Sequence, residues 1–260
     1  MYPVINILGF NIASYGLMNL LGFGLGIILA SWRAKKRGIS FEQEFLLLIH
    51  ICFGVFIGAK LLFLVINIDY IWQHKDIIFQ SMDNLITYLG GGFVFYGGLA
   101  GGIIAAYIYC HHYQEPFLKM LEIAVPSIPL IHAMGRIGCF LAGCCYGIHV
   151  NSWLGITFTC SPYAPNGISL FPVQLLEAGI NLILFIVLLG CARRERRPFQ
   201  LLGFYLLFYS LARFILEYLR FDEARGIYGG LSTSQWISIL VFTIALYLLL
   251  AKRIKQIPSA

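Results

Sequence analysis

Long apolar segments separated by shorter polar ones dominate the pattern of this chain. Each apolar run has about 20 residues, which is enough to cross roughly 30 Å of hydrocarbon as a helix. Seven runs are predicted to span a membrane: residues 12–32, 43–66, 89–110, 117–135, 172–191, 199–219 and 233–251. No internal repeat or soluble domain interrupts them. The pattern therefore predicts an all-α polytopic membrane protein, a single integral membrane domain over residues 1–260.

Composition excludes an ordinary soluble domain. The chain is 59% hydrophobic and 12% charged, and its mean hydropathy is +0.80. Soluble domains have roughly 45–50% apolar and about 25% charged residues. No short basic segment followed by a cleavage site begins the chain, so we expect the first apolar run to be retained as a span.

The basic residues predict the orientation of the spans. Twelve of the 18 lysines and arginines follow the first, third, fifth or seventh run. These residues are Arg33, Lys35, Lys36, Arg37, Lys119, Arg193, Arg194, Arg196, Arg197, Lys252, Arg253 and Lys255. With seven spans all twelve fall on one side, so the positive-inside rule predicts N-out, C-in topology. The net charge of +6 then reflects orientation, and no nucleic-acid partner is expected.

The long connections fall on the predicted outer side, at residues 67–88, 136–171 and 220–232. The connection 136–171 is rich in Gly, Pro, Asn and Ser, so it is expected to form a small periplasmic element of turns and short extended pieces. The segment 67–88 is expected to be the other main outer-face insertion. Long loops carry functional sites more often than short ones, so the site is expected at the outer face or in a cavity open to it.

A small set of ionisable residues interrupts the apolar runs, at a cost of about 2.5–3.5 kcal/mol or more for each at a span's centre. The set is His50, Lys60, His132, Arg136, Glu177, Arg213, Glu217 and Arg220. Arg213 and Glu217 are four residues apart and can pair on one helical face, which Arg220 continues. With Arg136 they favour a cationic pocket for a phosphate-bearing lipid. A structural ion pair that tethers helices is the alternative.

Single polar or small residues in the other runs have simpler interpretations. His50 and His132 are interpreted as interhelical hydrogen-bonding residues. Lys60 either reaches out toward the membrane surface or adds to the anion site. Glycines at 90–92, 97–98 and 101–102 favour close helix packing, and Tyr96 is expected to face whatever space they open.

Three thiols follow Arg136 in the motif at residues 135–147: Cys139, Cys144 and Cys145. Three alternatives remain open: inert packing residues, structural disulfides with Cys160 as a further partner, or reactive thiols near Arg136. A zinc site is less favoured, because the nearest outer histidine completes no familiar ligand spacing. The other cysteines are interpreted as small core residues of the spans: Cys52, Cys110 and Cys191.

Five short motifs carry a resemblance to a known family. They are Tyr-Gly-Leu at 15–17, Phe-Tyr-Gly-Gly-Leu at 95–99, Gly-Arg-Ile-Gly-Cys-Phe at 135–140, Pro-Val-Gln-Leu-Leu-Glu at 172–177 and Arg-Phe-Ile-Leu-Glu-Tyr-Leu-Arg at 213–220. With these motifs the chain resembles bacterial prolipoprotein diacylglyceryl transferases over most of its length. Seven spans with N-out, C-in topology also match that family.

The resemblance implies an activity. The family transfers a diacylglyceryl group from phosphatidylglycerol to the lipobox cysteine thiol of a prolipoprotein signal peptide, and glycerol phosphate leaves. The expected location is the bacterial inner membrane, which a multi-pass protein would occupy with its site at the outer face. Membrane lipids are therefore expected partners, and no cofactor or metal is expected.

The resemblance also implies site residues. The expected catalytic residues are Arg136, Arg213, Glu217, Tyr96 and Cys139. The expected substrate-binding residues are Tyr15, Lys60, Gly97, Gly98, Arg220, Cys144, Gln174 and Glu177. The arginines at 136, 213 and 220 would hold the phosphate, Glu217 would orient Arg213, and Tyr15 would line the lipid site.

This chain departs from the family motifs at four positions. Tyr96 stands where the family has a histidine, and a phenol with a pKa near 10 is a poor base at neutral pH. Cys139 and Ala142 replace asparagines, and Cys144 replaces a glutamate. A divergent paralogue that does thiol or redox chemistry, or uses another acceptor, is therefore an alternative. A lipid or small-molecule carrier is a third.

Overall fold

The computed structural model describes residues 2–7, 9–78, 80–90, 92–194, 199–221 and 226–250. Helices make up most of it, with three short hairpins. The chain divides into two compact units. The first unit joins Met1–Arg33 to Leu118–Pro258, and the second is Ala34–Phe117.

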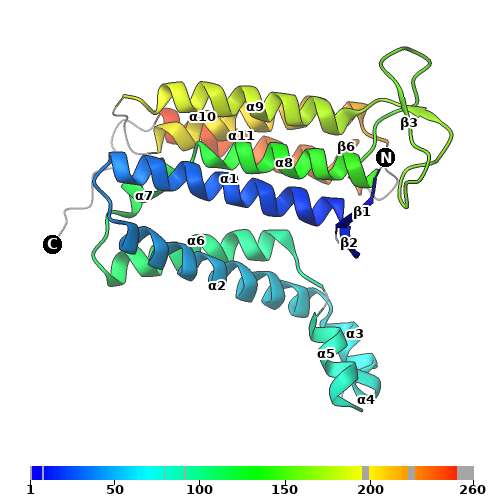
Figure 1. Cartoon of the computed structure of the whole chain (residues 1–260), viewed down its shortest axis with the longest axis horizontal. Coiled ribbons are helices and arrows are strands. Elements are labelled where there is room, and N and C mark those ends of the chain that lie inside the picture. The colour runs from blue at the N-terminus through cyan, green and yellow to red at the C-terminus, as the bar shows by residue number, and fades with distance from the viewer. Residues whose placement is uncertain are drawn as a thin grey trace. The chain divides into compact units, whose positions relative to one another are not determined.

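Long helices that run along one another form the first unit (Figure 1). Its elements are α1 (Ser14–Lys36), α7 (Phe117–Ala124), α8 (Ser127–Ala142), α9 (Val173–Cys191), α10 (Gln200–Leu216), the 3₁₀ turn η1 (Glu217–Leu219) and α11 (Thr233–Leu250). A buried apolar cluster lies where the ends of α9 and α10 meet the α7–α8 junction, and comprises Val125, Leu188, Ala192, Leu201 and Tyr205.

The fourth predicted run is a bent helix pair that extends beyond its predicted end. The axes of α7 and α8 differ by 41° across a short break at Val125 and Pro126. Proline fits such a break because it has no backbone N–H to continue the helix. The predicted end at residue 135 is wrong: α8 continues to Ala142. Gly138 does not end the helix but allows α1 to approach, since a Cβ there would lie 3.1 Å from Met18 Cβ.

Short hairpins lie at one end of the first unit (Figure 1). They pair β1 (Val4–Ile7) with β2 (Phe10–Ala13), β3 (Ile156–Thr157) with β4 (Ser169–Leu170), and β5 (Ile227–Tyr228) with β6 (Leu231–Ser232). The first hairpin was not predicted. The prediction of turns and short extended pieces is confirmed after residue 142, where Phe158, Ala164 and Leu170 form a small core.

Two long paired helices are the main elements of the second unit, α2 (Phe41–Ile66) and α6 (Phe95–His112). A capping box between Ser40 and Gln43 starts α2. A Cβ at Gly101 would overlap the carbonyl oxygen of Gly54, and one at Gly97 that of Gly58, so the predicted close packing is confirmed for these two glycines. Gly91, which the prediction also included, lies outside the described residues. The predicted insertion 67–88 contains the short helices α3 (Ile68–Gln73) and α4 (Lys75–Ile78) and most of α5 (Met82–Gly90). Its place at the outer face stays a prediction.

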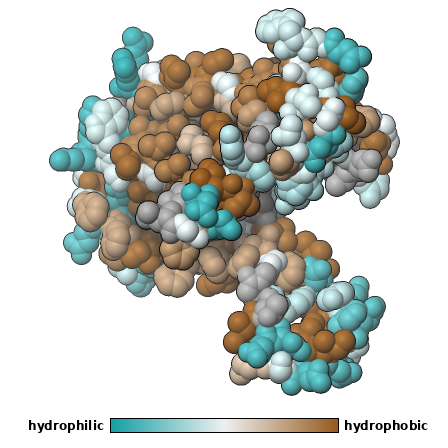
Figure 2. Space-filling model, turned by 45° about the vertical axis from the view of Figure 1, so that its right-hand side comes forward, coloured by the Kyte–Doolittle hydropathy of each residue, from teal (hydrophilic) through white to brown (hydrophobic). Residues whose placement is uncertain are grey.

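The prediction of an all-α membrane protein is confirmed. Among the described residues, five helical segments are long and apolar enough to cross a membrane: α1, α2, α9, Gln200–Leu219 and α11. The α7–α8 pair makes six if it counts as one span. The third predicted run corresponds to α6, which begins later, at Phe95. Hydrophobic residues cover much of the face shown in Figure 2, as lipid contact requires.

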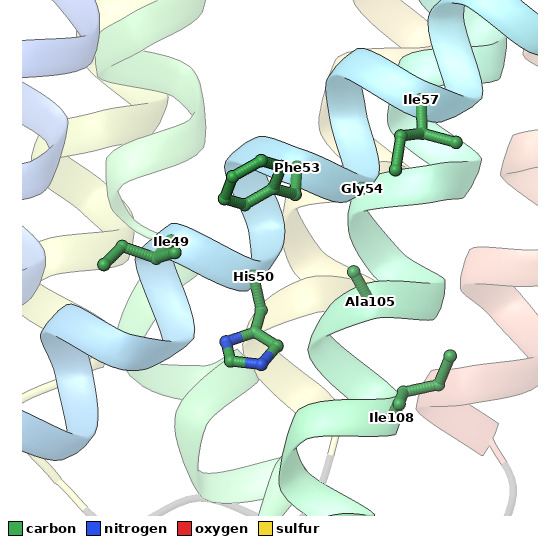
Figure 3. Close-up of a pocket in the computed structure, with 7 residues that line it drawn as sticks. All are labelled: Ile49, His50, Phe53, Gly54, Ile57, Ala105 and Ile108. Carbon is green, nitrogen blue, oxygen red and sulfur yellow. The ribbon is translucent and has the colours of Figure 1, made fainter.

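An apolar pocket of about 400 Å³ lies on the α2–α6 pair. Figure 3 shows its lining: Ile49, His50, Phe53, Gly54, Ile57, Ala105 and Ile108. The predicted interhelical hydrogen bond of His50 is wrong, because its Nδ1 lies 2.7 Å from the carbonyl oxygen of Leu46 one turn earlier in α2. Its contact with α6 is the ring of Tyr109, 4.9 Å away. The lining holds no charged residue that could bind phosphate.

Candidate functional site

Three arginines and two glutamates from different helices meet in the first unit. Arg136 comes from α8, Glu177 from α9, Arg213 from α10, and Glu217 and Arg220 from the turn that follows α10. Their side chains are between 2% and 15% exposed. These five residues are called the arginine–carboxylate cluster below.

Glu177 joins three helices in this cluster. Its Oε1 lies 3.1 Å from Arg136 Nε, and its Oε2 lies 3.7 Å from Arg213 Nη1. His132 Nε2 is 3.7 Å from the same Oε1, and the Tyr209 hydroxyl donates to it at 3.4 Å. Glu177 was predicted as a substrate-binding residue, and the structure places it at the centre of an ion-pair network.

Glu217 is the second carboxylate of the cluster. Arg213 Nη2 lies 2.9 Å from Glu217 Oε2, so the predicted i,i+4 pair is confirmed. Arg220 Nη1 is 3.8 Å from that oxygen. Arg213 Nη2 also donates to Ser234 Oγ on α11 at 3.0 Å. Arg213 is thereby held from three sides.

The charge of the cluster favours an anionic ligand. The cluster contains three guanidinium groups and two carboxylates. Buried charge interacts more strongly than exposed charge because the surroundings screen it less. Among the described residues, Arg213 Nη1 has no hydrogen-bond acceptor. Planar guanidinium groups match phosphate oxygens in geometry and charge, so a phosphate group is the ligand that the cluster fits best.

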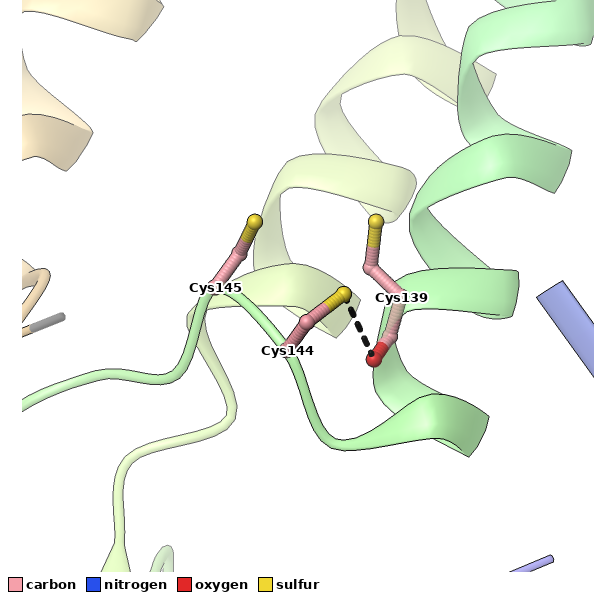
Figure 4. Close-up of side chains that lie close together, drawn as sticks. All are labelled: Cys139, Cys144 and Cys145. Atoms are coloured by element: carbon pink, nitrogen blue, oxygen red, sulfur yellow. Dashed lines mark hydrogen bonds between the residues drawn. The ribbon is translucent and has the colours of Figure 1, made fainter. Parts of the chain in front are cut away.

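Three thiols lie beside the end of α8 and are called the thiol cluster below. Cys139, Cys144 and Cys145 have Sγ atoms within 4.8 Å of one another. Figure 4 shows one sulfur from the helix and two from the loop that follows. The Cys144 thiol donates to the Cys139 carbonyl oxygen at 3.7 Å. Hydrogen bonds from Cys139 and Cys144 lower the pKa of the Cys145 thiol, and the Arg220 and Arg136 charges act in the same direction.

The loop that carries two of these thiols is tied to its neighbours. Gln174 Nε2, on the first turn of α9, donates to the Cys144 carbonyl oxygen at 2.8 Å. The backbone of Gly147 pairs with that of Arg220 as an antiparallel bridge. Left-handed backbone at Gly143, with φ of 78°, and at Cys145, with φ of 57°, turns the chain sharply here. The thiol cluster is therefore held close to the arginine–carboxylate cluster.

The cysteine predictions have mixed outcomes. All seven cysteines are free, so the alternative of a structural disulfide with Cys160 is wrong. Cys110 is buried, as expected of a core residue, and Cys191 is partly buried. Cys52 is exposed on the flank of α2, so its assignment to the core is wrong.

Tyr15 lies in the first turn of α1, next to α8. A Cβ at Gly138 would lie 3.2 Å from Tyr15 Cα. Asn19 Nδ2 donates to the Tyr15 carbonyl oxygen at 2.8 Å. The side chain of Tyr15 is 48% exposed, so it is accessible to a lipid.

Four predicted site residues belong to the second unit. Lys60 Nζ donates to the Tyr88 carbonyl oxygen at 3.3 Å and lies 4.8 Å from the centre of the Phe63 ring, a cation–π arrangement. Tyr96 is exposed on the first turn of α6. Gly97 and Gly98 both face α2: a Cβ at Gly97 would overlap the Gly58 carbonyl oxygen, and one at Gly98 would lie 3.3 Å from Val55. Their roles toward substrate stay predictions.

Two contributors to the cluster were missed, Tyr209 and Ser234. Tyr209 precedes Arg213 by four residues, so helical spacing could have indicated it. His132 likewise precedes Arg136 by four residues. Its Nε2 lies 3.7 Å from Glu177 Oε1 and its ring lies 4.9 Å from the Tyr209 ring, so it contacts α9 and α10, while its predicted interhelical hydrogen bond stays a prediction. Ser234 gives no such signal, because its contact with Arg213 depends on how α11 packs.

The apolar helices define a multi-span helical membrane protein, and a buried arginine–carboxylate cluster lies within it. The comparisons identify the family more narrowly. The model of the family described as prolipoprotein diacylglyceryl transferase matches residues 3–251. The chain belongs to this family.

Several relatives have names that agree. A phosphatidylglycerol–prolipoprotein diacylglyceryl transferase of Clostridium tetani is 37% identical over 98% of this chain and 100% of its own length. A second, numbered 2 in Clostridium perfringens, is 34% identical over 90% of this chain and 89% of its own. One from Legionella pneumophila is 28% identical over 97% of this chain and 99% of its own.

Proposed function

We propose that this protein transfers a diacylglyceryl group from phosphatidylglycerol to the cysteine thiol of a prolipoprotein, at the outer face of the bacterial inner membrane. Its family and the names of its relatives support this activity. The observation that carries the proposal is the buried cluster of Arg136, Arg213 and Arg220 around two glutamates, because guanidinium groups match phosphate oxygens in geometry and charge.

The reaction forms a thioether. The acceptor thiol loses its proton, its sulfur attacks the terminal glyceryl carbon of the diacylglyceryl group, and the carbon–oxygen bond to phosphate breaks. Glycerol phosphate leaves with the bonding electron pair. Because negative charge grows on the departing phosphate, Arg136, Arg213 and Arg220 stabilise the transition state. Glu217 orients Arg213, and Glu177 holds Arg136 and Arg213 in one geometry.

The remaining predicted residues have supporting roles in this proposal. Tyr15 lines the lipid site, and Gln174 positions the loop with Cys144 next to Cys139 in the site. In the second unit, Tyr96 is proposed as a catalytic residue, and Lys60, Gly97 and Gly98 are proposed as substrate-binding residues. The lipobox segment of the prolipoprotein signal peptide supplies the acceptor cysteine.

The proposed topology is seven spans in one membrane domain, with the N-terminus outside and the C-terminus inside. The apolar helices and the basic residues that follow α1 and α9 support it. The exposed Cys160 gives a test. A membrane-impermeant maleimide should label a variant whose only cysteine is Cys160 in intact spheroplasts. Labelling only after the membrane is opened would place this loop inside.

The activity itself can be tested with purified protein. Isotope-labelled phosphatidylglycerol and a lipobox peptide should give a peptide adduct of diacylglyceryl mass. Arg136→Ala should reduce the rate by about 100–1000-fold, as loss of a group that stabilises developing charge does. Arg193→Ala, which removes an exposed arginine after α9, is the matched control and should keep full activity. No adduct with the unaltered protein, or full activity in Arg136→Ala, would contradict the proposal.

A further inference from the structure

The thiol cluster has no assigned role in the transfer reaction beyond lining the site. Its three Sγ atoms lie within 4.8 Å of one another. Three thiolates around a tetrahedral Zn²⁺ ion at about 2.3 Å stand roughly 3.8 Å apart. Small side-chain rotations would therefore bring the sulfurs to ligand distance. We propose that Cys139, Cys144 and Cys145 bind a thiophilic divalent cation of the zinc type.

The backbone around the cluster supports a built site. Cys139 is fixed in the last turn of α8 and buried, and Cys144 and Cys145 are partly buried. The Cys144 N–H donates to the Cys139 carbonyl oxygen at 3.1 Å, and Gln174 holds the Cys144 carbonyl from α9. The Phe221 N–H donates to the Tyr146 carbonyl oxygen at 3.2 Å, just after Cys145. All three ligands therefore come from anchored positions.

The surrounding charge favours a bound thiolate complex. Binding releases the three thiol protons to solvent, and three thiolates with a divalent cation carry one net negative charge. Arg136 lies one helical turn before Cys139, and Arg220 pairs through its backbone with Gly147, two residues after Cys145. Both arginines belong to the arginine–carboxylate cluster. The positive charges of Arg136 and Arg220 thereby offset the negative charge of the complex in a partly buried place, where an isolated anion would be costly.

Three protein ligands leave the fourth tetrahedral position open, as in catalytic zinc sites. This further step rests on the proposed function. The acceptor there is a thiol, and a thiol loses its proton when it coordinates a divalent cation. An acceptor sulfur in the fourth position would be a thiolate beside the arginines that hold the departing phosphate. The cation would thus activate the acceptor without a histidine base.

Metal binding can be measured apart from transfer activity. Full-length protein in detergent, reduced and freed of reductant without oxygen, is titrated with Co²⁺ or Cd²⁺. One ion per chain, with thiolate-to-metal charge-transfer absorption, is expected. Each of Cys139→Ser, Cys144→Ser and Cys145→Ser should weaken binding at least about tenfold, because each removes one of only three ligands. Cys160→Ser, which alters an exposed cysteine outside the cluster, should bind as the unaltered protein does.

Several outcomes would overturn the site. The first is that the protein binds no stoichiometric ion, and the second is that binding survives in all three serine variants. The third is a disulfide within the cluster in protein isolated without reductant. Where a serine variant does not fold, reversible thiosulfonate blocking of the unaltered protein replaces it. Blocking must abolish the charge-transfer absorption, and reductant must restore it; absorption that persists after blocking also contradicts the site.

The acceptor step has its own test. A lipobox peptide with cysteine should change the visible d–d bands of the Co²⁺ form, and the same peptide with serine should not. A site that binds Co²⁺ but responds equally to both peptides would retain the metal site and overturn acceptor coordination. Transfer activity that persists at full rate in protein shown to be free of metal would overturn it as well, while leaving the proposed function intact.

Discussion

The two units hold their helices together by different means. In the first unit α8, α9 and α10 meet through buried charges centred on Glu177. In the second, α2 and α6 meet through glycine backbones, with Gly101 against Gly54. Small residues are a usual way to join helices in lipid. Buried ion pairs add little net stability because desolvation offsets their attraction. The charges of the first unit are therefore better explained by chemistry than by folding.

Removal of the central carboxylate should give the largest effect. Glu177→Ala leaves Arg136 and Arg213 buried without their shared partner, so the free energy of unfolding should fall by about 3–5 kcal/mol. SDS titration followed by circular dichroism measures this loss. Glu177→Gln keeps a hydrogen-bond acceptor and should lose less. Equal stability of Glu177→Ala and the unaltered protein would mean that Glu177 does not join these helices.

The second-largest effect tests whether the planar guanidinium group of Arg213 is required, or only its positive charge. Arg213 contacts Glu217 at 2.9 Å, Glu177 at 3.7 Å and Ser234 at 3.0 Å. A lysine has one ammonium and cannot reproduce this fork, so Arg213→Lys should lower transfer activity by about 10–100-fold. The matched change Arg193→Lys, at an exposed arginine, should have no effect. Equal activity of both variants would argue that positive charge alone is required at residue 213.

Sequence was a good guide to elements whose signal is local. The predicted runs 172–191 and 233–251 agree closely with α9, Val173–Cys191, and α11, Thr233–Leu250, because apolar length alone marks them. The Arg213–Glu217 pair was found because i,i+4 spacing brings side chains together within one helix.

Other features depend on tertiary contacts and were missed. Glu177 could be singled out as an ionisable residue in an apolar run, but its partners lie on other helices. The end of α8 was placed too early, at residue 135, because the apolar run stops before Arg136, whereas the helix continues to Ala142 with Gly138 against α1. The hairpin Val4–Ala13 carries no burial alternation along β2 that could have indicated a strand.

One added methyl group should disrupt the close contact between α2 and α6 at Gly54 and Gly101. Gly101→Ala places a Cβ against the Gly54 carbonyl oxygen, so the helices must separate, at a cost of about 1–3 kcal/mol. Gly179→Ala on α9 is the matched control, because a Cβ there meets no atom within 4 Å among the described residues. It should be neutral or stabilising by up to about 1 kcal/mol, since alanine favours the helix. Thermal unfolding in detergent compares them, and equal changes in both would argue against close α2–α6 packing.

The smallest expected effect comes from the hydrogen bond between Tyr209 and Glu177, as distinct from the ion pairs that Glu177 makes in the first unit. Tyr209→Phe removes a hydroxyl that donates to Glu177 at 3.4 Å but keeps the ring, which lies 5.6 Å from the Tyr205 ring and 4.9 Å from the His132 ring. Because this hydrogen bond is long, its loss should lower the free energy of unfolding by about 0.5–1 kcal/mol. SDS titration of Tyr209→Phe alongside Glu177→Ala gives the comparison. A loss as large as that of Glu177→Ala would show that hydrogen bonding, rather than paired charge, holds α9 to α10. The two units would then differ in that one joins its helices by polar side chains and the other by glycine backbones, and buried charge would not be what distinguishes them.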